Sequence, residues 1–194
     1  MAADLVRLSC TSKGTTARSV VHVMCTSNNE NVAQSLNSNI TISIILPIII
    51  NSRASSAWKH DTRKFGPLNA LSNNTEDAWK SAQSEESDPL AYFEIDFHRP
   101  VHVNELRIQF QGGFAGMDCI VYQSCGESVD QTTDWEECED LFIDPIDSNE
   151  VQTFESEADD ASGKCSALRI EFGRSTDFYG RIVIYSLEVW GTES

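Results

Sequence analysis

Three stretches of this sequence alternate between apolar and polar residues, and this period of two is typical of a strand rather than of a helix. In "LRIQF", residues 106–110, the apolar positions are Leu106, Ile108 and Phe110. The stretches "LAYFEIDF" at 90–97 and "ALRIEF" at 167–172 repeat the pattern. We expect half-buried strands with Phe93, Ile95, Phe97, Leu168, Ile170 and Phe172 facing inward, and with Tyr92, Glu94, Asp96, Arg169 and Glu171 facing outward.

The rest of the chain after Trp58 agrees with this pattern. "RIVIYSLEVW", residues 181–190, begins apolar on both faces and then settles to Val183, Tyr185, Leu187 and Val189 inward. Gly, Pro, Asn and Asp residues separate the alternating stretches. Several short strands with such turns indicate an antiparallel sandwich or barrel, so the predicted class is all-β.

The aromatic residues mark a boundary. All seventeen lie between Trp58 and the C-terminus, and aromatic side chains dominate the energetics of protein cores. We therefore divide the chain into an N-terminal segment, 1–51, poorly ordered from about residue 15, and a β-sandwich domain, 52–194. The apolar run at 40–50 contains Pro47 and is too short for a spanning helix, which needs roughly 20 residues. Without a secretion signal at its start, the chain is expected in the nucleus or cytoplasm.

The charge of the chain limits the classes of partner that it can bind. The net charge is −16, which argues against binding to nucleic acid or to an anionic membrane. Fourteen of the acidic residues lie between Glu127 and Asp160, where there is no Lys or Arg. This acidic segment is a solvated loop region or a surface for a basic partner. A basic or neutral protein partner fits best.

The six cysteines are expected to be free thiols, because an intracellular chain seldom forms disulfides. They are Cys10, Cys25, Cys119, Cys125, Cys138 and Cys165, and no Cys-x-x-Cys pair occurs among them. A zinc site is therefore not predicted. His98 and His102 flank Pro100 and are expected to be structural or surface residues rather than a metal pair.

Several motifs of the domain point to a known family. "NTEDAWKSA", "FEIDFHRPVHVNELRIQF" and "GRIVIYSLEVWG" resemble the opening and closing elements of discoidin-type, galactose-binding-like domains. "LRIQFQGGF", "VQTF" and "STDFYGRIVIYSLEVWG", in that order, resemble a family of proteins associated with a testicular orphan nuclear receptor. The resemblance covers roughly 52–191. Secreted discoidin relatives usually carry a cysteine near each domain end, whereas this chain has none after Cys165.

This resemblance implies a jelly-roll β-sandwich without enzymatic activity, which acts as a co-regulator that represses nuclear-receptor-dependent transcription. The partner that the resemblance implies is a protein, such as the nuclear receptor itself, and no cofactor is implied. A domain that binds carbohydrate or another small ligand, like a lectin, is the alternative. Relative to the family, "LVRLSC" and "SRASSAWKHDTRKFG" are separated by extra residues, either a lineage-specific insertion or a retained intron.

The candidate binding residues cluster near glycines at predicted strand ends, where this fold class places its binding loops. Phe114 follows Gly112 and Gly113, and either caps the core or stands exposed as an anchor. In "STDFYGR", polar side chains favour a turn, which would project its two aromatics. The full set is Trp79, Gln111, Gly112, Gly113, Phe114, Asp177, Phe178, Tyr179 and Arg181.

Catalytic motifs are missing from the sequence: it has no P-loop, no Gly-x-Ser-x-Gly and no His-Glu-x-x-His. We therefore predict a protein that is not an enzyme. Asn73, Glu76 and Asp77 before Trp79 are either a simple turn, in which Asn and Asp bond to their own backbone, or the carboxylate side of a structural cation site.

Overall fold

The computed structural model describes residues 51–72, 74, 76–84, 89–126, 129, 133–158 and 164–193. The N-terminal segment predicted at 1–51 lies outside these residues, apart from Asn51 itself, so its boundary and its disorder stay predictions. No helix within the described ranges is long and apolar enough to cross a membrane.

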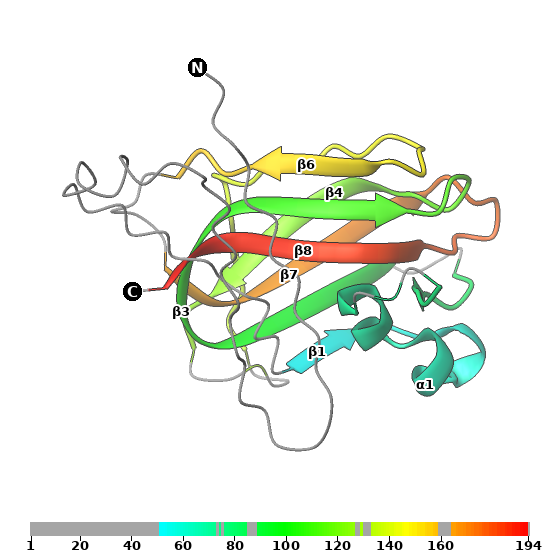
Figure 1. The fold of residues 1–194 in the computed structure, drawn as a ribbon, viewed down its shortest axis with the longest axis horizontal. Coiled ribbons are helices and arrows are strands. Elements are labelled where there is room, and N and C mark those ends of the chain that lie inside the picture. Colours follow the sequence, from blue (N-terminus) through cyan, green and yellow to red (C-terminus); the bar gives the residue numbers. More distant parts are fainter. Residues whose placement is uncertain are drawn as a thin grey trace, which may run out of the picture. The chain divides into compact units, whose positions relative to one another are not determined.

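Strands dominate the described residues (Figure 1). The described chain begins with four short elements: β1 (Asn51–Ala54), a 3-10 turn η1 (Trp58–His60), the helix α1 (Thr62–Phe65) and a second 3-10 turn η2 (Pro67–Leu71). The strands that follow are β2 (Trp79–Lys80), β3 (Ala91–Phe110), β4 (Gly116–Ser124), β5 (Glu136–Glu137), β6 (Val151–Glu155), β7 (Cys165–Ser175) and β8 (Val183–Glu193).

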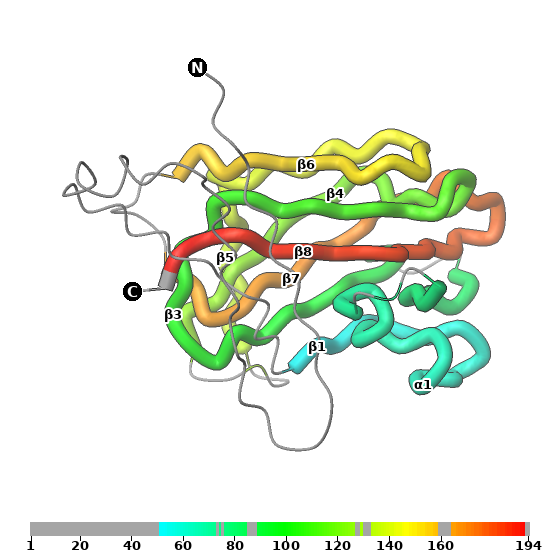
Figure 2. Tube along the Cα trace, in the orientation of Figure 1, coloured from blue at the N-terminus to red at the C-terminus, as the bar shows by residue number. Residues whose placement is uncertain are grey.

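Strand β3 joins the two layers of the sandwich. Its first half pairs with β1 and β7, and its second half pairs with β6 and β8, all antiparallel. Between the halves the register shifts, His98 takes a positive φ of 51°, and the strand bends (Figure 2). The strand order β2-β8-β3-β7-β4-β5, with β1 and β6 also on β3, forms the predicted antiparallel jelly-roll β-sandwich. The strands expected separately at 90–97 and 106–110 are instead the two halves of this one bent strand.

The core lies between the layers and is built on aromatic rings. Trp79 packs edge-on against Phe93 with ring centroids 5.3 Å apart, and Phe172 lies 6.3 Å from both Trp79 and Phe110. All four side chains are fully buried. The Trp79 indole N–H also donates a hydrogen bond of 2.9 Å to the Ser56 carbonyl oxygen, which ties the start of the domain to the core.

The alternation predicts the inward faces correctly, because Leu106, Ile108 and Phe110 are all fully buried. The prediction that Glu94 and Asp96 face solvent is wrong, because both residues, in the first half of β3, are buried as well. Arg169 lies 3.7 Å from the Glu94 carboxylate, and the Val129 backbone N–H donates to Asp96 at 3.3 Å. A side chain of β7 and the segment after β4 therefore cover a face expected in solvent.

Candidate functional site

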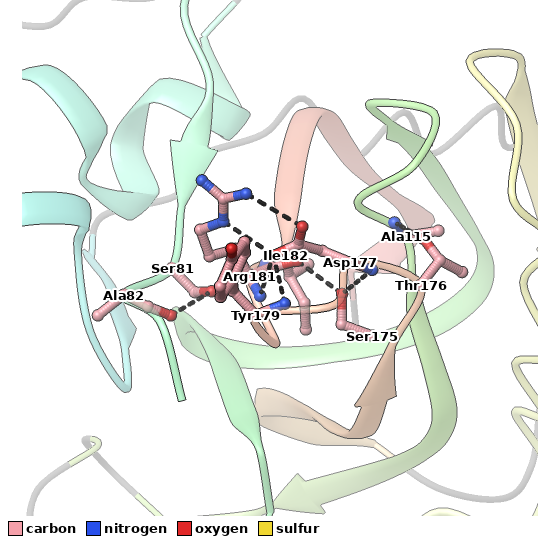
Figure 3. Close-up of polar contacts among 9 residues, drawn as sticks. All are labelled: Ser81, Ala82, Ala115, Ser175, Thr176, Asp177, Tyr179, Arg181 and Ile182. Carbon is pink, nitrogen blue, oxygen red and sulfur yellow. Dashed lines mark hydrogen bonds and ion pairs between the residues drawn. The ribbon is translucent and has the colours of Figure 1, made fainter. Parts of the chain in front are cut away.

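The candidate site is the loop that joins β7 to β8, residues 175–181, together with its neighbours (Figure 3). Side chains fold the loop through hydrogen bonds to its own backbone. The Asp177 N–H donates to Ser175 Oγ at 3.0 Å, and the Asp177 carboxylate accepts from the N–H groups of Tyr179 at 3.2 Å and Arg181 at 3.1 Å. Gly180 adopts a φ of 70°. This is the turn that the sequence motif indicates.

Asp177 and Arg181 form an ion pair within the loop. Arg181 donates from Nε at 2.8 Å and from Nη2 at 3.0 Å to the two carboxylate oxygens. Only 9% of the Asp177 side chain and 27% of the Arg181 side chain is exposed. The hydrogen bond from Arg181 lowers the pKa of the Asp177 carboxyl group, and the same bond raises the pKa of the Arg181 guanidinium. Both groups are therefore charged at neutral pH.

Three aromatic rings from different parts of the chain surround the Arg181 guanidinium. Its central carbon lies 5.0 Å from the ring centroid of Phe114, 5.3 Å from that of Trp58 and 5.5 Å from that of Tyr179. Each distance is within the range of a cation–π contact. Phe114 is half-buried in this arrangement. It therefore packs on an arginine, and is neither a core residue nor an isolated exposed anchor.

Phe178 and Tyr179 lie at the exposed end of the loop. Phe178 is 86% exposed, the largest fraction among the exposed large hydrophobic residues that the structure describes, and Tyr179 is 47% exposed. Their rings pack edge-on with centroids 5.3 Å apart. We call Phe178, Tyr179, Arg181 and Phe114 the loop-end cluster.

The loop at 111–113, which we call the Gly-Gly loop, is held in place by hydrogen bonds from its backbone. The Gly112 N–H donates to Asn149 Oδ1 at 2.6 Å, and the Gly113 N–H donates to Asp147 Oδ1 at 2.7 Å. The Gln111 N–H bonds to the Val183 carbonyl oxygen at 3.0 Å, which joins this loop to the start of β8. Part of the acidic segment thus supports the Gly-Gly loop, and no local sequence signal predicted this contact.

Trp79 is a correction to the predicted set. Its side chain is fully buried between the layers, so it supports the core and has no surface for a partner. Trp58, which the sequence analysis did not single out, contacts Arg181 instead. Ser81 was missed too: its Oγ accepts a hydrogen bond of 2.8 Å from the Ile182 N–H, and so fixes the chain just after Arg181.

A groove of about 320 Å³ runs beside Phe178. Ser84 and Leu90 line it together with residues from the end of β7 and from the loop. The lining residues from β7 and the loop are Gly173, Arg174, Ser175, Asp177, Phe178 and Gly180. Arg174 is paired with Asp118, which accepts from Nη2 at 3.0 Å.

The other candidate positions carry no ligand geometry in the described part of the chain. The Asn74 side-chain amide donates to Asp77 at 2.8 Å and its carbonyl oxygen accepts from the Glu76 N–H at 3.2 Å, as a turn requires, while Asn73 lies outside the described residues. No group of three or more His, Cys, Asp or Glu residues able to hold a metal occurs among the described residues. His98 lies 3.3 Å from the Asp96 carboxylate at the bend of β3, and His102 is buried.

Four of the six cysteines fall in the described ranges, and all four are free thiols. Burial raises the pKa of Cys119 and of Cys165 to about 12. Cys125 is exposed, and its Sγ donates to the Lys164 carbonyl oxygen at 3.0 Å. Cys10 and Cys25 lie outside the described residues.

The relatives of the chain decide its family. It is 33% identical over 152 residues to the nuclear receptor 2C2-associated protein of Homo sapiens, covering 78% of this chain and 98% of that protein. The protein of the same name from Danio rerio is 36% identical over 140 residues, covering 72% and 89%. The chain belongs to the family of nuclear receptor 2C2-associated proteins. The family resemblance seen in the motifs is thereby confirmed, although no protein-family model matches the chain.

Solved structures place this family member in the galactose-binding-like fold. The chitosan-binding module 1 of a Paenibacillus chitosanase/glucanase superposes with a TM-score of 0.56 at 15% identity, covering 73% of this chain and 94% of the module. An F5/8 type C domain from Bacteroides fragilis gives 0.55 at 11% identity, covering 74% and 92%. At these identities the likeness concerns the fold alone.

Proposed function

We propose that this chain is a non-catalytic protein-interaction module, which binds a nuclear receptor and represses transcription that depends on it. The names of its relatives support an association with a nuclear receptor. The observation that carries the proposed surface is the 86% exposure of Phe178 on a loop that Asp177 and Arg181 hold in place. A rigid exposed aromatic supplies contact area at low entropic cost, which is typical of binding hot spots.

The role of each residue in the loop-end cluster follows from its exposure. Phe178 and the exposed part of Tyr179 make the contact with the receptor, while Arg181 positions them and Phe114 supports Arg181 from below the surface. The net charge of −16 opposes direct contact with DNA or with an anionic membrane. We propose that the protein contacts the receptor itself rather than the receptor's DNA site. The location that this function requires is the nucleus or cytoplasm.

A pull-down of purified nuclear receptor 2C2 by the tagged full chain tests this proposal. Phe178→Ala is expected to weaken binding by roughly 2 kcal/mol or more, which is about a thirtyfold increase in Kd. Leu68→Ala is the matched control, because Leu68 is also an exposed apolar residue, at 63%, but belongs to η2. Unchanged binding of Phe178→Ala would contradict the surface, and absence of binding by the wild-type chain would contradict direct association.

The groove beside Phe178 supports a second candidate function, the binding of a carbohydrate or another small ligand. An exposed ring beside Ser84, Arg174 and Asp177 offers both a stacking platform and polar groups. A glycan array probed with the full chain separates the two functions. Saturable glycan binding that Phe178→Ala abolishes would favour this second candidate.

A further inference from the structure

Strand β6 has an extended neighbour that sequence periodicity alone did not identify, residues 141–146. The Glu157 N–H donates to the Asp140 carbonyl oxygen at 2.8 Å. The Gln152 side chain accepts from the Ile146 N–H at 2.8 Å and donates to its carbonyl oxygen at 2.9 Å. These bonds at both ends hold 141–146 antiparallel beside β6 (Figure 2).

This neighbour presents one buried and one exposed row of side chains. Leu141 and Ile143 are each 2% exposed and belong to the core. Phe142 is 75% exposed and Ile146 is 66% exposed, with the exposed Asp144 between them. Alternating exposure in an extended chain means that these three side chains point away from the core together.

The exposed row continues onto the outward side of β6. Val151 is 54% exposed, and Thr153 and Glu155 are exposed as well, whereas Gln152 and Phe154 face inward. The strand register then extends the surface across β3 and β8, because opposite residues of antiparallel strands share a face. We call this surface the outer β6 face; its residues are Phe142, Asp144, Ile146, Val151, Thr153, Glu155, Glu105, Arg107, Gln109, Ser186, Glu188 and Trp190.

The charges of the outer β6 face are strongly one-sided. Its carboxylates are Glu105, Asp144, Glu155 and Glu188, and its one cation is Arg107. Arg107 is bonded to Glu105 and lies 4.7 Å above the Trp190 ring. Among the described residues, neither Asp144 nor Glu155 takes part in an ion pair. The face therefore combines three exposed apolar side chains with uncompensated negative charge.

We propose that the outer β6 face binds a basic amphipathic helix of a protein partner. Exposed apolar side chains grouped on a sheet mark an interaction surface, and an amphipathic helix packs on a sheet through its apolar stripe. Lysines and arginines beside that stripe complement the carboxylates. A second copy of this chain would bring like charges together, and an anionic membrane would be repelled. This surface goes beyond the receptor-binding function and shares no residue with the loop-end cluster.

The test uses the full chain and a fluorescein-labelled peptide of Leu and Lys, roughly 18 residues long, so that about five helical turns can form. A peptide of the same composition, scrambled to remove the apolar stripe, is the matched control. Fluorescence anisotropy is expected to show saturable binding of the first peptide, at least about tenfold tighter than the second. Equal binding of both peptides would mean general charge attraction and would overturn the proposal.

Variants then locate the site. Phe142→Ser combined with Ile146→Ser should weaken peptide binding at least about tenfold, while Leu68→Ser leaves it unchanged. Asp144→Asn combined with Glu155→Gln should weaken binding and reduce its dependence on salt, and this second pair alters charge without removing any apolar group. Binding that survives both pairs overturns the proposal.

Two further measurements test whether a second copy of the chain occupies this surface instead, and whether the peptide binds at the loop-end cluster instead. Size-exclusion chromatography should show the same elution for the wild type and for the Phe142→Ser, Ile146→Ser variant; a wild-type dimer that this variant dissociates would identify a second copy as the occupant and overturn the proposal. Phe178→Ala should leave peptide binding intact. A loss there would move the peptide to the loop-end cluster and likewise overturn it, whatever the receptor pull-down shows.

Discussion

The Asp177 carboxylate accepts hydrogen bonds from the Arg181 Nε and Nη2 atoms at 2.8 and 3.0 Å, across four residues of a single loop. The same carboxylate accepts from two backbone N–H groups, and the guanidinium packs on the Phe114 and Tyr179 rings. One ion pair thus fixes the backbone turn and the aromatic side chains together. The exposed position of Phe178 depends on this pair, because Phe178 lies between its two members in the sequence.

The first prediction is that Asp177→Asn lowers stability at neutral pH by about 2 kcal/mol, because charge-assisted hydrogen bonds in a shielded pair are lost. The pKa of Asp177 in the folded chain is below its ordinary value of 3.8. Its charged form therefore stabilises the fold above that pH, and the contribution disappears as the pH falls through the folded pKa. Urea melts at a series of pH values should show the difference between wild type and variant shrinking below pH 3.8.

The exposed pair of Asp118 and Arg174 is the control for this experiment. Their side chains are 55% and 67% exposed, so solvent screens the interaction. Asp118→Asn is therefore expected to change stability far less than Asp177→Asn does. Equal losses in the two variants would show that shielding of the Asp177 pair has no consequence.

The second prediction separates Phe114 from Phe178. Phe114→Ala removes a half-buried ring from the Arg181 guanidinium and should cost about 2 kcal/mol of stability. Phe178→Ala removes a side chain that is 86% exposed and should stay within about 0.5 kcal/mol of wild type. Thermal melts of the two variants measure the difference, and a destabilised Phe178→Ala would mean that its ring packs on the domain.

The strands were predictable because side-chain alternation is a local property. The alternation within a single segment is enough to identify the buried face of Leu106, Ile108 and Phe110. The burial of Glu94 and Asp96 was not predictable in this way, since Arg169 and Val129, which contact them, are distant in sequence. The period of two shows that a strand has two faces, but not whether a remote segment covers the second.

In the candidate site, too, the local features could be predicted from the sequence and the contacts with distant segments could not. The turn at Ser175, Asp177 and Gly180 is local chemistry and could be predicted from seven residues. Asn149 and Asp147, which hold the Gly-Gly loop, come from a segment interpreted only by its charge. Trp79 was misplaced because a tryptophan before a strand has the same local signature whether it lines a surface or fills the core.

The third prediction concerns the thiols. Burial raises the pKa of Cys119 and Cys165 to about 12, so almost no reactive thiolate forms there at neutral pH. Iodoacetamide treatment of the native chain should modify the exposed Cys125 well before either of them, as measured by peptide mass spectrometry over time. Unfolding in guanidinium should make the three react alike. Early modification of Cys165 in the native state would contradict its burial.

The last prediction compares two glycines with positive φ. Gly180 has a φ of 70°, and a Cβ atom there would lie 1.8 Å from the Ser84 carbonyl oxygen, whereas Gly113 has a φ of 81° with no atom within 4 Å of the same position. Gly113→Ala should therefore cost only backbone strain, about 1 kcal/mol. Gly180→Ala adds a clash with backbone that must move, so we expect a loss of roughly 3 kcal/mol or more. Because the displaced segment carries Phe178 and Tyr179, Gly180→Ala should also weaken the receptor pull-down, and Gly113→Ala should not. Equal stability of the two variants in denaturant melts would show that the loop moves away from Ser84 freely, and the loop end would then not be the rigid surface described above.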